Sequence, residues 1–160
     1  MNLLIKRTKD IDVLQQVIAC SFQTVADQFG LTSDNCSTNP AFITQQHIFN
    51  AIENDALFFG LFEEEHMAGC VSVKRESDEI YTITRLAVLP AKRHLGYGTM
   101  LLDYAVDHIH KHKGRIISIG IMDQNRVLKS YYEAYGFVEV KKIQPTSLPF
   151  VVCIMQKHLS

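Results

Sequence analysis

Residues 86–99 have the sequence Leu86-Ala-Val-Leu-Pro-Ala-Lys-Arg93-His-Leu-Gly96-Tyr-Gly98-Thr99. This pattern predicts an apolar strand, then an Arg-x-x-Gly-x-Gly turn, then a helix. The two glycines let backbone N–H groups approach a ligand closely, and the unpaired N–H groups that begin a helix attract anions. Arg93 adds a positive charge that phosphate oxygens can share. The stretch therefore predicts a phosphate-binding turn, with an ordinary tight turn as the alternative.

A second informative segment is Asn125-Arg-Val-Leu-Lys-Ser-Tyr-Tyr132-Glu-Ala-Tyr-Gly136-Phe137. Together with the turn it resembles the GNAT N-acetyltransferase superfamily, specifically over residues 79–137 and loosely elsewhere. The resemblance implies an α/β fold with a central mixed, mostly antiparallel sheet of six to seven strands and about four flanking helices. It also implies an acetyltransferase that passes the acetyl group of acetyl-CoA to an amine. A Walker loop is excluded because the turn lacks Gly-Lys-Ser/Thr.

The resemblance also implies positions for the coenzyme. The family's Arg/Gln-x-x-Gly-x-Gly/Ala element corresponds to residues 93–98, and the pantetheine arm is expected along the backbone of residues 86–88, where one amide polarises the thioester carbonyl. The expected coenzyme contacts are Leu86, Ala87, Val88, Arg93, His94, Leu95, Gly96, Tyr97, Gly98, Thr99 and Asn125.

Tyr132 is the expected catalytic residue, because it matches the family's coenzyme A tyrosine. Its phenol, with an ordinary pKa of about 10, is protonated at neutral pH and can give a proton to the departing thiolate. Asn125 precedes it by seven residues. This is two helical turns, so both side chains are expected to face one ligand. Tyr131 is one position out of register.

The general base departs from the family pattern. Many members carry a glutamate at positions that match Thr82 or Thr84 here, and threonine cannot accept the proton. A water held by these threonines, with Glu79 nearby, or an acceptor that arrives as a free amine are the alternatives. We therefore expect an N-acetyltransferase that acts directly in a ternary complex on a primary amine of a small molecule or protein. A non-catalytic acyl-CoA sensor or interaction module is the second hypothesis.

The composition predicts one domain over residues 1–160. Hydrophobic residues make up 47% and charged residues 21%, and the net charge is −1. These values give no indication of nucleic-acid binding, and no apolar run has the length of a membrane span. The amino terminus is unlike a signal peptide, so a cytoplasmic location is expected. A homodimer is left open.

Cysteines and histidines give no metal motif. The four cysteines lack any Cys-x-x-Cys pair and are expected to be reduced, with Cys20 and Cys70 in the core and Cys36 in an exposed loop. No metal site is expected at His108, His110 and His112, which fit the cationic end of a helix. A ping-pong route through a thiol is disfavoured, although Cys70 and Cys153 are left as candidates for the cleft.

Hydrophobic periodicity and caps predict the elements. The expected strands are Leu3–Lys6, Ala56–Glu63, Met67–Lys74, Ile80–Leu89, Ile116–Ile121, Phe137–Lys142 and Phe150–Gln156. The expected helices run from Asp10 to Gly30, from Asn39 through Ile52, from Gly96 to His112 and from Asn125 to Tyr135. The acceptor is expected between the first two helices and the last hairpin, where Phe22, Phe29, Phe42, Gln46, His47 and Phe150 are available.

Overall fold

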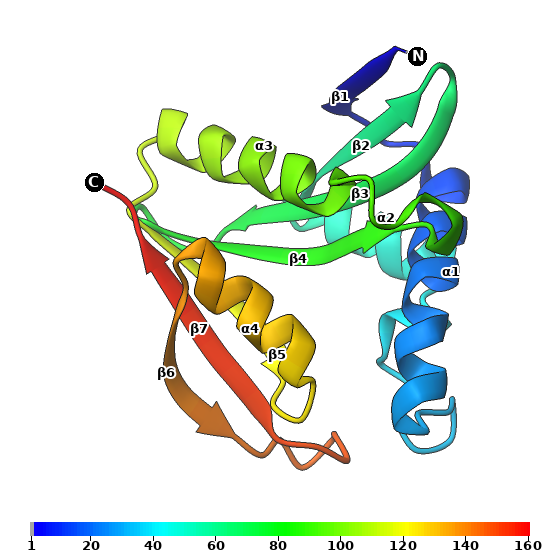
Figure 1. The fold of residues 1–160 in the computed structure, drawn as a ribbon, viewed down its shortest axis with the longest axis vertical. Coiled ribbons are helices and arrows are strands. Elements are labelled where there is room, and N and C mark those ends of the chain that lie inside the picture. The colour runs from blue at the N-terminus through cyan, green and yellow to red at the C-terminus, as the bar shows by residue number, and fades with distance from the viewer. Residues whose placement is uncertain (1) are drawn as a thin grey trace.

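The protein is described by a computed structural model that covers residues 2–160, in which one seven-stranded sheet carries helices on both faces (Figure 1). The strands are β1 (Leu3–Arg7), β2 (Leu57–Glu63), β3 (His66–Arg75), β4 (Ile80–Val88), β5 (Ile116–Met122), β6 (Val138–Ile143) and β7 (Val152–His158). The helices are α1 (Ile11–Phe29), α2 (Gln45–Glu53), α3 (Tyr97–Lys111) and α4 (Arg126–Tyr135), with 3₁₀ turns η1 (Pro40–Phe42) and η2 (Pro90–Lys92). The mixed α/β fold class expected from the sequence is confirmed.

The strand order is β1-β2-β3-β4-β5-β7-β6, and every neighbouring pair is antiparallel except β4 and β5. Those two strands pair in parallel only over Ile80–Thr82 and Ile116–Ser118. Beyond Thr82 they separate, so that the sheet opens into a V (Figure 1). The opening leaves one edge of β4 without a strand partner within residues 2–160.

A β-bulge interrupts β4 just before its carboxyl end. Cys70 pairs with Ala87 and Ser72 pairs with Thr84, so Arg85 and Leu86 both stand opposite Val71. Arg85 has a φ of 51°, in the left-handed region that side chains other than glycine seldom adopt. Because side chains alternate between faces in a regular strand, the extra residue changes which side chains face each side of the sheet.

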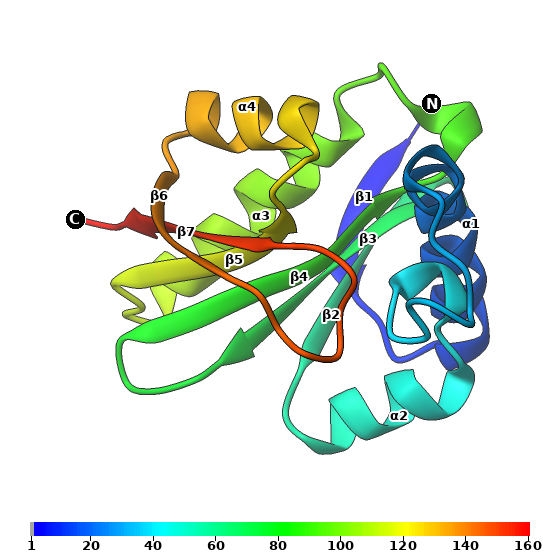
Figure 2. The same cartoon turned by 90° about the horizontal axis from the view of Figure 1, so that it is seen from below.

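The helices divide between the two faces, with α1 and α2 on one and α3 and α4 on the other (Figure 2). Helix α1 buries Leu14, Val17 and Ile18 against the sheet, begins where Asp10 accepts a hydrogen bond from the Val13 N–H, and ends at Gly30. Among residues 2–160, no helix combines the length and apolar character that crossing a bilayer requires.

The second expected helix begins later than predicted. Asn39 caps only the short turn η1, and the backbone is extended at Ile43 and at Thr44. Thr44 then caps α2, where its hydroxyl accepts from the His47 N–H and the His47 ring accepts from the Thr44 N–H. Asn39 and Thr44 are two caps only five residues apart, and the sequence alone reads them as one helix start because each satisfies the same capping rule.

Two cysteine placements were also wrong. Cys20 is exposed on α1, whereas Cys36 is buried at 2% exposure in a small cluster with Ala26 and Leu31. The polar composition of the loop predicted exposure for Cys36, but the loop folds back on the end of α1. The last strand is shifted as well, since β7 begins at Val152 rather than Phe150.

Candidate functional site

A cleft of about 560 Å³ occupies the V between β4 and β5. Its β4 side includes Leu86 and Val88, and its β5 side is formed by Ile119–Met122. Helix α1 and the segment before β7 add Phe22 and Phe150 to the lining, two of the aromatic residues expected near the acceptor. The cleft is mainly apolar where it lies between the strands, which suits a flexible organic chain.

The predicted turn lies at the start of α3, beside this cleft. Gly96 is the N-cap with a φ of 82°, and no side chain caps the helix. A Cβ at Gly96 would meet no atom within 4 Å, and one at Gly98 would meet only Val88 Cγ2 at 3.9 Å. His94, Leu95 and Thr99 are exposed around the turn. The free N–H groups of the first helical turn can therefore be reached by an anion from outside.

Arg93 lines the cleft but also holds α1. Its Nη1 donates to Thr24 Oγ1 at 3.0 Å, and its Nη2 donates to the Ser21 carbonyl at 2.8 Å. The sequence predicted a guanidinium that shares its charge with phosphate oxygens. The structure gives it a second role as the link between α1 and the turn.

Two expected contacts face away from the cleft. The Tyr97 side chain is buried and its hydroxyl donates to Glu63 Oε2 at 2.5 Å, and Lys92 Nζ lies 2.7 Å from the other oxygen of that carboxylate. Hydrogen bonds from Lys92 and Tyr97 lower the pKa of Glu63 below its ordinary value. Ala87 is 1% exposed and packs in the core, with its carbonyl turned to Gly69 on β3. Tyr97 can therefore offer a ligand at the turn only its backbone, because its side chain is buried. Ala87 does not line the cleft.

The main chain of β4 nevertheless presents groups to the cleft. Because backbone direction alternates along a strand, Leu86 and Val88 face the edge that β5 leaves free. The Val88 N–H donates to Ser21 Oγ at 3.1 Å, and Ser21 itself is 6% exposed. An extended ligand can pair with this edge as an added strand if it competes with that one hydroxyl.

Tyr132 and Asn125 both line the cleft, as the spacing predicted. Tyr132 is 5% exposed, and burial raises the pKa of its phenol well above the ordinary value. Asn125 is the N-cap of α4, where Oδ1 accepts from the Leu128 N–H, and its amide nitrogen is the group left for a ligand. The Tyr131 hydroxyl lies 2.8 Å from Thr99 Oγ1, so it joins α4 to α3.

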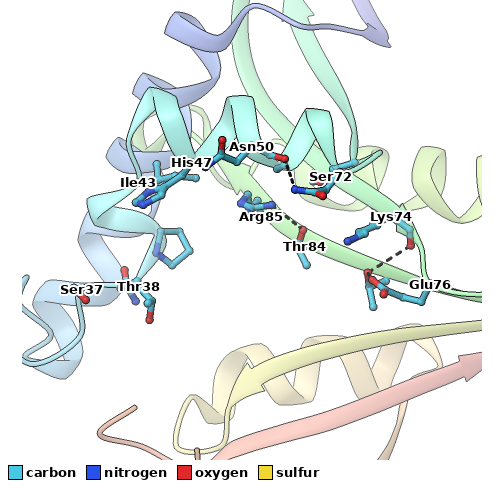
Figure 3. A pocket seen from close by; sticks show the side chains of 16 residues that line it. Ser37, Thr38, Ile43, His47, Asn50, Ser72, Lys74, Glu76, Thr84 and Arg85 are labelled. Atoms are coloured by element: carbon cyan, nitrogen blue, oxygen red, sulfur yellow. Dashed lines mark hydrogen bonds between the residues drawn. The ribbon is translucent and has the colours of Figure 1, made fainter. Parts of the chain in front are cut away.

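A second, polar pocket of about 660 Å³ lies across β4 from the cleft (Figure 3). The two hollows share Thr38, Asn39, Pro40, Thr84 and Arg85. The polar pocket therefore adjoins the cleft at the bulge of β4.

This pocket contains a carboxylate that the sequence reasoning missed. Glu76, in the turn between β3 and β4, accepts a hydrogen bond from the Thr82 hydroxyl at 2.9 Å. Glu79, the carboxylate considered from the sequence, instead lies 3.7 Å from Arg115 at the exposed end of the sheet. The position of Glu76 in the pocket could not be predicted from residue spacing along one strand. The register of the β3–β4 hairpin, which pairs Lys74 with Thr82, brings Glu76 to the Thr82 hydroxyl.

The three buried thiols divide between core and cleft. Neither Cys70 nor Cys153 lines the cleft or the polar pocket, and both are buried. Burial raises the pKa of Cys70 to about 12, which keeps the thiol protonated. Cys36 does line the cleft, at 2% exposure.

Among the described residues, one set of three potential metal-ligating side chains comes within 4.8 Å: Asp123, Glu139 and Cys153. Lys129 Nζ lies 2.5 Å from Glu139 Oε1 and 3.6 Å from Asp123 Oδ1. The ammonium group already supplies positive charge between these carboxylates, so the cluster forms an ion-pair network.

The remaining residues expected at the acceptor have different locations. His47 lines the polar pocket, whereas Phe29 and Phe42 pack in the cluster around Ala26. Gln46 donates to Asn50 Oδ1 at 2.8 Å on α2 and lines neither hollow.

Comparison with known proteins identifies a family and a shared fold. A family model described as acetyltransferase (GNAT) family matches residues 24–137. A search of curated proteins found no match. Among solved structures, the PaiA N-acetyltransferase of Thermoplasma acidophilum in complex with coenzyme A is similar at a TM-score of 0.79 and 22% identity, covering 99% of this chain and 100% of the other.

Two further solved structures have the same fold. The structure of YncA of Salmonella typhimurium with its cofactor acetyl-CoA gives a TM-score of 0.74 at 15% identity over 100% of this chain and 95% of that one. The ribosomal-protein-S18-alanine N-acetyltransferase of Escherichia coli gives 0.76 at 18% identity, over 99% and 95%. At these identities the similarity is one of fold.

Proposed function

The chain belongs to the GNAT acetyltransferase family, and on this premise we propose that it transfers the acetyl group of acetyl-CoA directly to a primary amine of a small molecule or protein. The observation that carries the proposal is the meeting of the apolar cleft and the polar pocket at Thr84 and Arg85. One hollow suits a coenzyme arm and the other a polar acceptor, and both open on the same point of β4.

In this proposal the coenzyme occupies the V-shaped cleft. The turn at Gly96 and Gly98 receives the pyrophosphate, and the pantetheine arm extends along Leu86 and Val88. Support comes from the open space at both glycines and from the free edge of β4. The complexes of PaiA with coenzyme A and of YncA with acetyl-CoA are consistent with this use of the fold.

The transfer needs no intermediate on the protein. The amine nitrogen attacks the thioester carbonyl, forming the C–N bond and then breaking the C–S bond. The Val88 amide stabilises the developing oxyanion once Ser21 releases it, and Tyr132 gives its proton to the leaving thiolate and regains one from solvent. The amine enters uncharged, and the proton it loses passes to water in the polar pocket beside Thr84 and Glu76.

Direct transfer is favoured over a covalent route by the placement of the thiols. Cys70 and Cys153 lie outside both hollows. The thiol at the cleft, Cys36, belongs to the loop after α1 and is only 2% exposed. Each needed step instead has a group on β4 or α4 beside the cleft.

The experiment is a coenzyme A release assay with acetyl-CoA and a panel of amines, preceded by calorimetric titration of acetyl-CoA. The panel includes amino acids, their amides, polyamines, arylalkylamines and peptides with free amino termini. Amine-dependent release, with the N-acetyl product identified by mass spectrometry, is the expected result. Tight acetyl-CoA binding with no release above hydrolysis for any amine would favour the sensor hypothesis instead. Full release in a Cys36→Ser variant is expected for direct transfer.

A further inference from the structure

The polar pocket has a wall made of alternate residues from two paired strands. Ser72 and Lys74 on β3 stand opposite Thr84 and Thr82 on β4, so these four side chains share one face of the sheet. All four line the pocket, and α2 supplies the facing wall with His47 and Asn50 (Figure 3). These polar side chains interrupt a face of the sheet that α1 and α2 otherwise bury with apolar residues.

The bulge adds Arg85 to that face. In a regular strand Thr84 and Arg85 would point to opposite sides, but both line the polar pocket and both reach the junction with the cleft. The left-handed backbone at Arg85 costs free energy, so the rest of the fold maintains this geometry.

Arg85 is partly buried without a counter-ion. No carboxylate of residues 2–160 lies within 4 Å of its guanidinium, which stacks 5.9 Å from the Phe58 ring and lies 3.5 Å from the Thr84 hydroxyl. Burial lowers the pKa of this guanidinium below its ordinary value, yet an arginine keeps its proton. A partly buried cation of this type is stabilised when an anion binds beside it.

Two further groups in the pocket lack partners. Lys74 has no carboxylate within 4 Å among the described residues. The Ser72 hydroxyl is buried in a residue that is 1% exposed, and no hydrogen-bond partner reaches it. Buried polar groups are nearly always paired, so an unpaired hydroxyl in a pocket indicates a position for a ligand or water.

The charges of the pocket favour an anion. Lys74 and Arg85 provide two cations against the single carboxylate of Glu76, which already accepts a hydrogen bond from the Thr82 hydroxyl. Since a guanidinium binds a carboxylate with two parallel N–H donors, Arg85 is the group best suited to receive it.

We infer that the polar pocket binds a carboxylate of the acceptor through Arg85, Lys74 and Ser72, so that the acceptor is an α-amino acid or a compound with the same adjacent amine and carboxylate. This inference rests on the proposed acetyl transfer. Because one carbon separates the two groups in such a compound, a carboxylate on Arg85 brings the amine to the junction where the cleft begins.

The test compares each α-amino acid with its own carboxamide, which removes the negative charge and keeps the amine and side chain. With acetyl-CoA as donor, kcat/KM for the acid is expected to exceed that for the amide by about tenfold or more. Arg85→Gln should reduce kcat/KM for acids by roughly 10- to 100-fold, chiefly through KM, and leave the amides unchanged. Arg85→Lys should restore part of the preference. Arg115→Gln, which removes an exposed charge just before the start of β5, should change neither value.

Lys74→Gln provides a second variant, with a smaller loss for acids only, in case Arg85→Gln unfolds. Amides acetylated as well as acids, or equal losses for both in Arg85→Gln, would overturn the inference while the acetyltransferase proposal stands.

The anion has one other source, the acyl group of the donor. If neutral amines are used best with succinyl-CoA, and Arg85→Gln removes that preference, the pocket serves the donor and the acceptor assignment is wrong. Binding of acetyl-CoA with no acylation of any amine would overturn the proposed function, and the inference with it.

Discussion

The Ser21 hydroxyl on α1 accepts a hydrogen bond from the Val88 N–H on β4, at 3.1 Å. Ser21 also accepts at its carbonyl from Arg93 Nη2, at 2.8 Å. One residue of α1 is thus joined to the strand that borders the cleft and to the turn that begins α3. The Val88 amide is the group proposed to polarise the thioester, so the hydroxyl of Ser21 occupies that position before the ligand does.

Ser21→Ala should tighten acetyl-CoA binding, because the Val88 amide no longer exchanges an internal partner for the ligand. A neutral hydrogen bond contributes about 0.5–1.5 kcal/mol, so the dissociation constant should fall roughly two- to tenfold. The free energy of unfolding should fall by about the same 0.5–1.5 kcal/mol. Calorimetric titration and chemical denaturation measure both quantities. Cys20→Ser, at the exposed neighbouring position, serves as the control. Weaker binding in Ser21→Ala would mean that the hydroxyl itself contacts the coenzyme.

Gly98→Val should weaken acetyl-CoA binding by about tenfold or more while the protein stays folded. The new side chain has room in the free protein, where Val88 Cγ2 is the nearest atom at 3.9 Å from the added Cβ. It would occupy the space through which phosphate reaches the backbone, and tenfold corresponds to about 1.4 kcal/mol. Gly98→Ala should show a smaller loss, and circular dichroism with thermal melting verifies the fold. An unchanged dissociation constant would remove this turn from the site.

Arg93→Ala should weaken coenzyme binding in a manner that depends on ionic strength, because salt screens a charge that faces phosphate. The loss should be larger at about 0.01 M salt than at about 1 M. The variant also loses two hydrogen bonds to α1, so its melting temperature should fall. Thr24→Val, which removes one of those bonds without removing charge, separates the two effects. Equal losses of affinity at both salt concentrations would point to the positioning of α1 alone.

Tyr132→Phe should lower kcat by roughly 10- to 10⁴-fold with little change in coenzyme affinity, because it removes the hydroxyl and keeps the ring. Since burial raises the pKa of this phenol, the wild-type enzyme should show no loss of kcat from its ionisation below about pH 10. Tyr131→Phe loses only the contact with Thr99 and is the matched control. Full turnover in Tyr132→Phe with an identified amine would assign the thiolate proton to water.

Glu63→Gln should lower the stability of the fold at neutral pH and make that stability depend less on pH in the acidic range. Lys92 and Tyr97 lower the pKa of this carboxyl in the folded state, so its contribution is present at neutral pH and is lost as pH falls through the folded-state pKa, below the ordinary range of glutamate. Melting temperatures between pH 7 and pH 3 should therefore converge for wild type and variant. Glu79→Gln, whose carboxylate is exposed, should follow the wild type. Parallel curves for Glu63→Gln and wild type would contradict this coupling.

The local sequence determined those features that depend only on residues close together in the chain. The glycine turn before α3, the Asp10 cap, the helix end at Gly30 and the placement of Tyr132 on α4 depend on residues within a few positions of one another, so spacing and capping rules predict them. The family resemblance over residues 79–137 then identified the fold, and the expected cleft residues Leu86, Val88, Arg93, Asn125 and Tyr132 do line one hollow.

Tertiary structure decided which groups these residues face. Tyr97 and Ala87 belong to the segment predicted to bind the coenzyme, but packing and strand alternation direct them elsewhere. The Tyr97 hydroxyl faces β2 and the Ala87 carbonyl faces β3. The bulge that exposes Arg85 to the polar pocket depends on the register between β3 and β4, and the unpaired Ser72 hydroxyl depends on which residues α2 places opposite it. Register and helix docking are set by contacts between residues far apart in the chain, so no local pattern contains them.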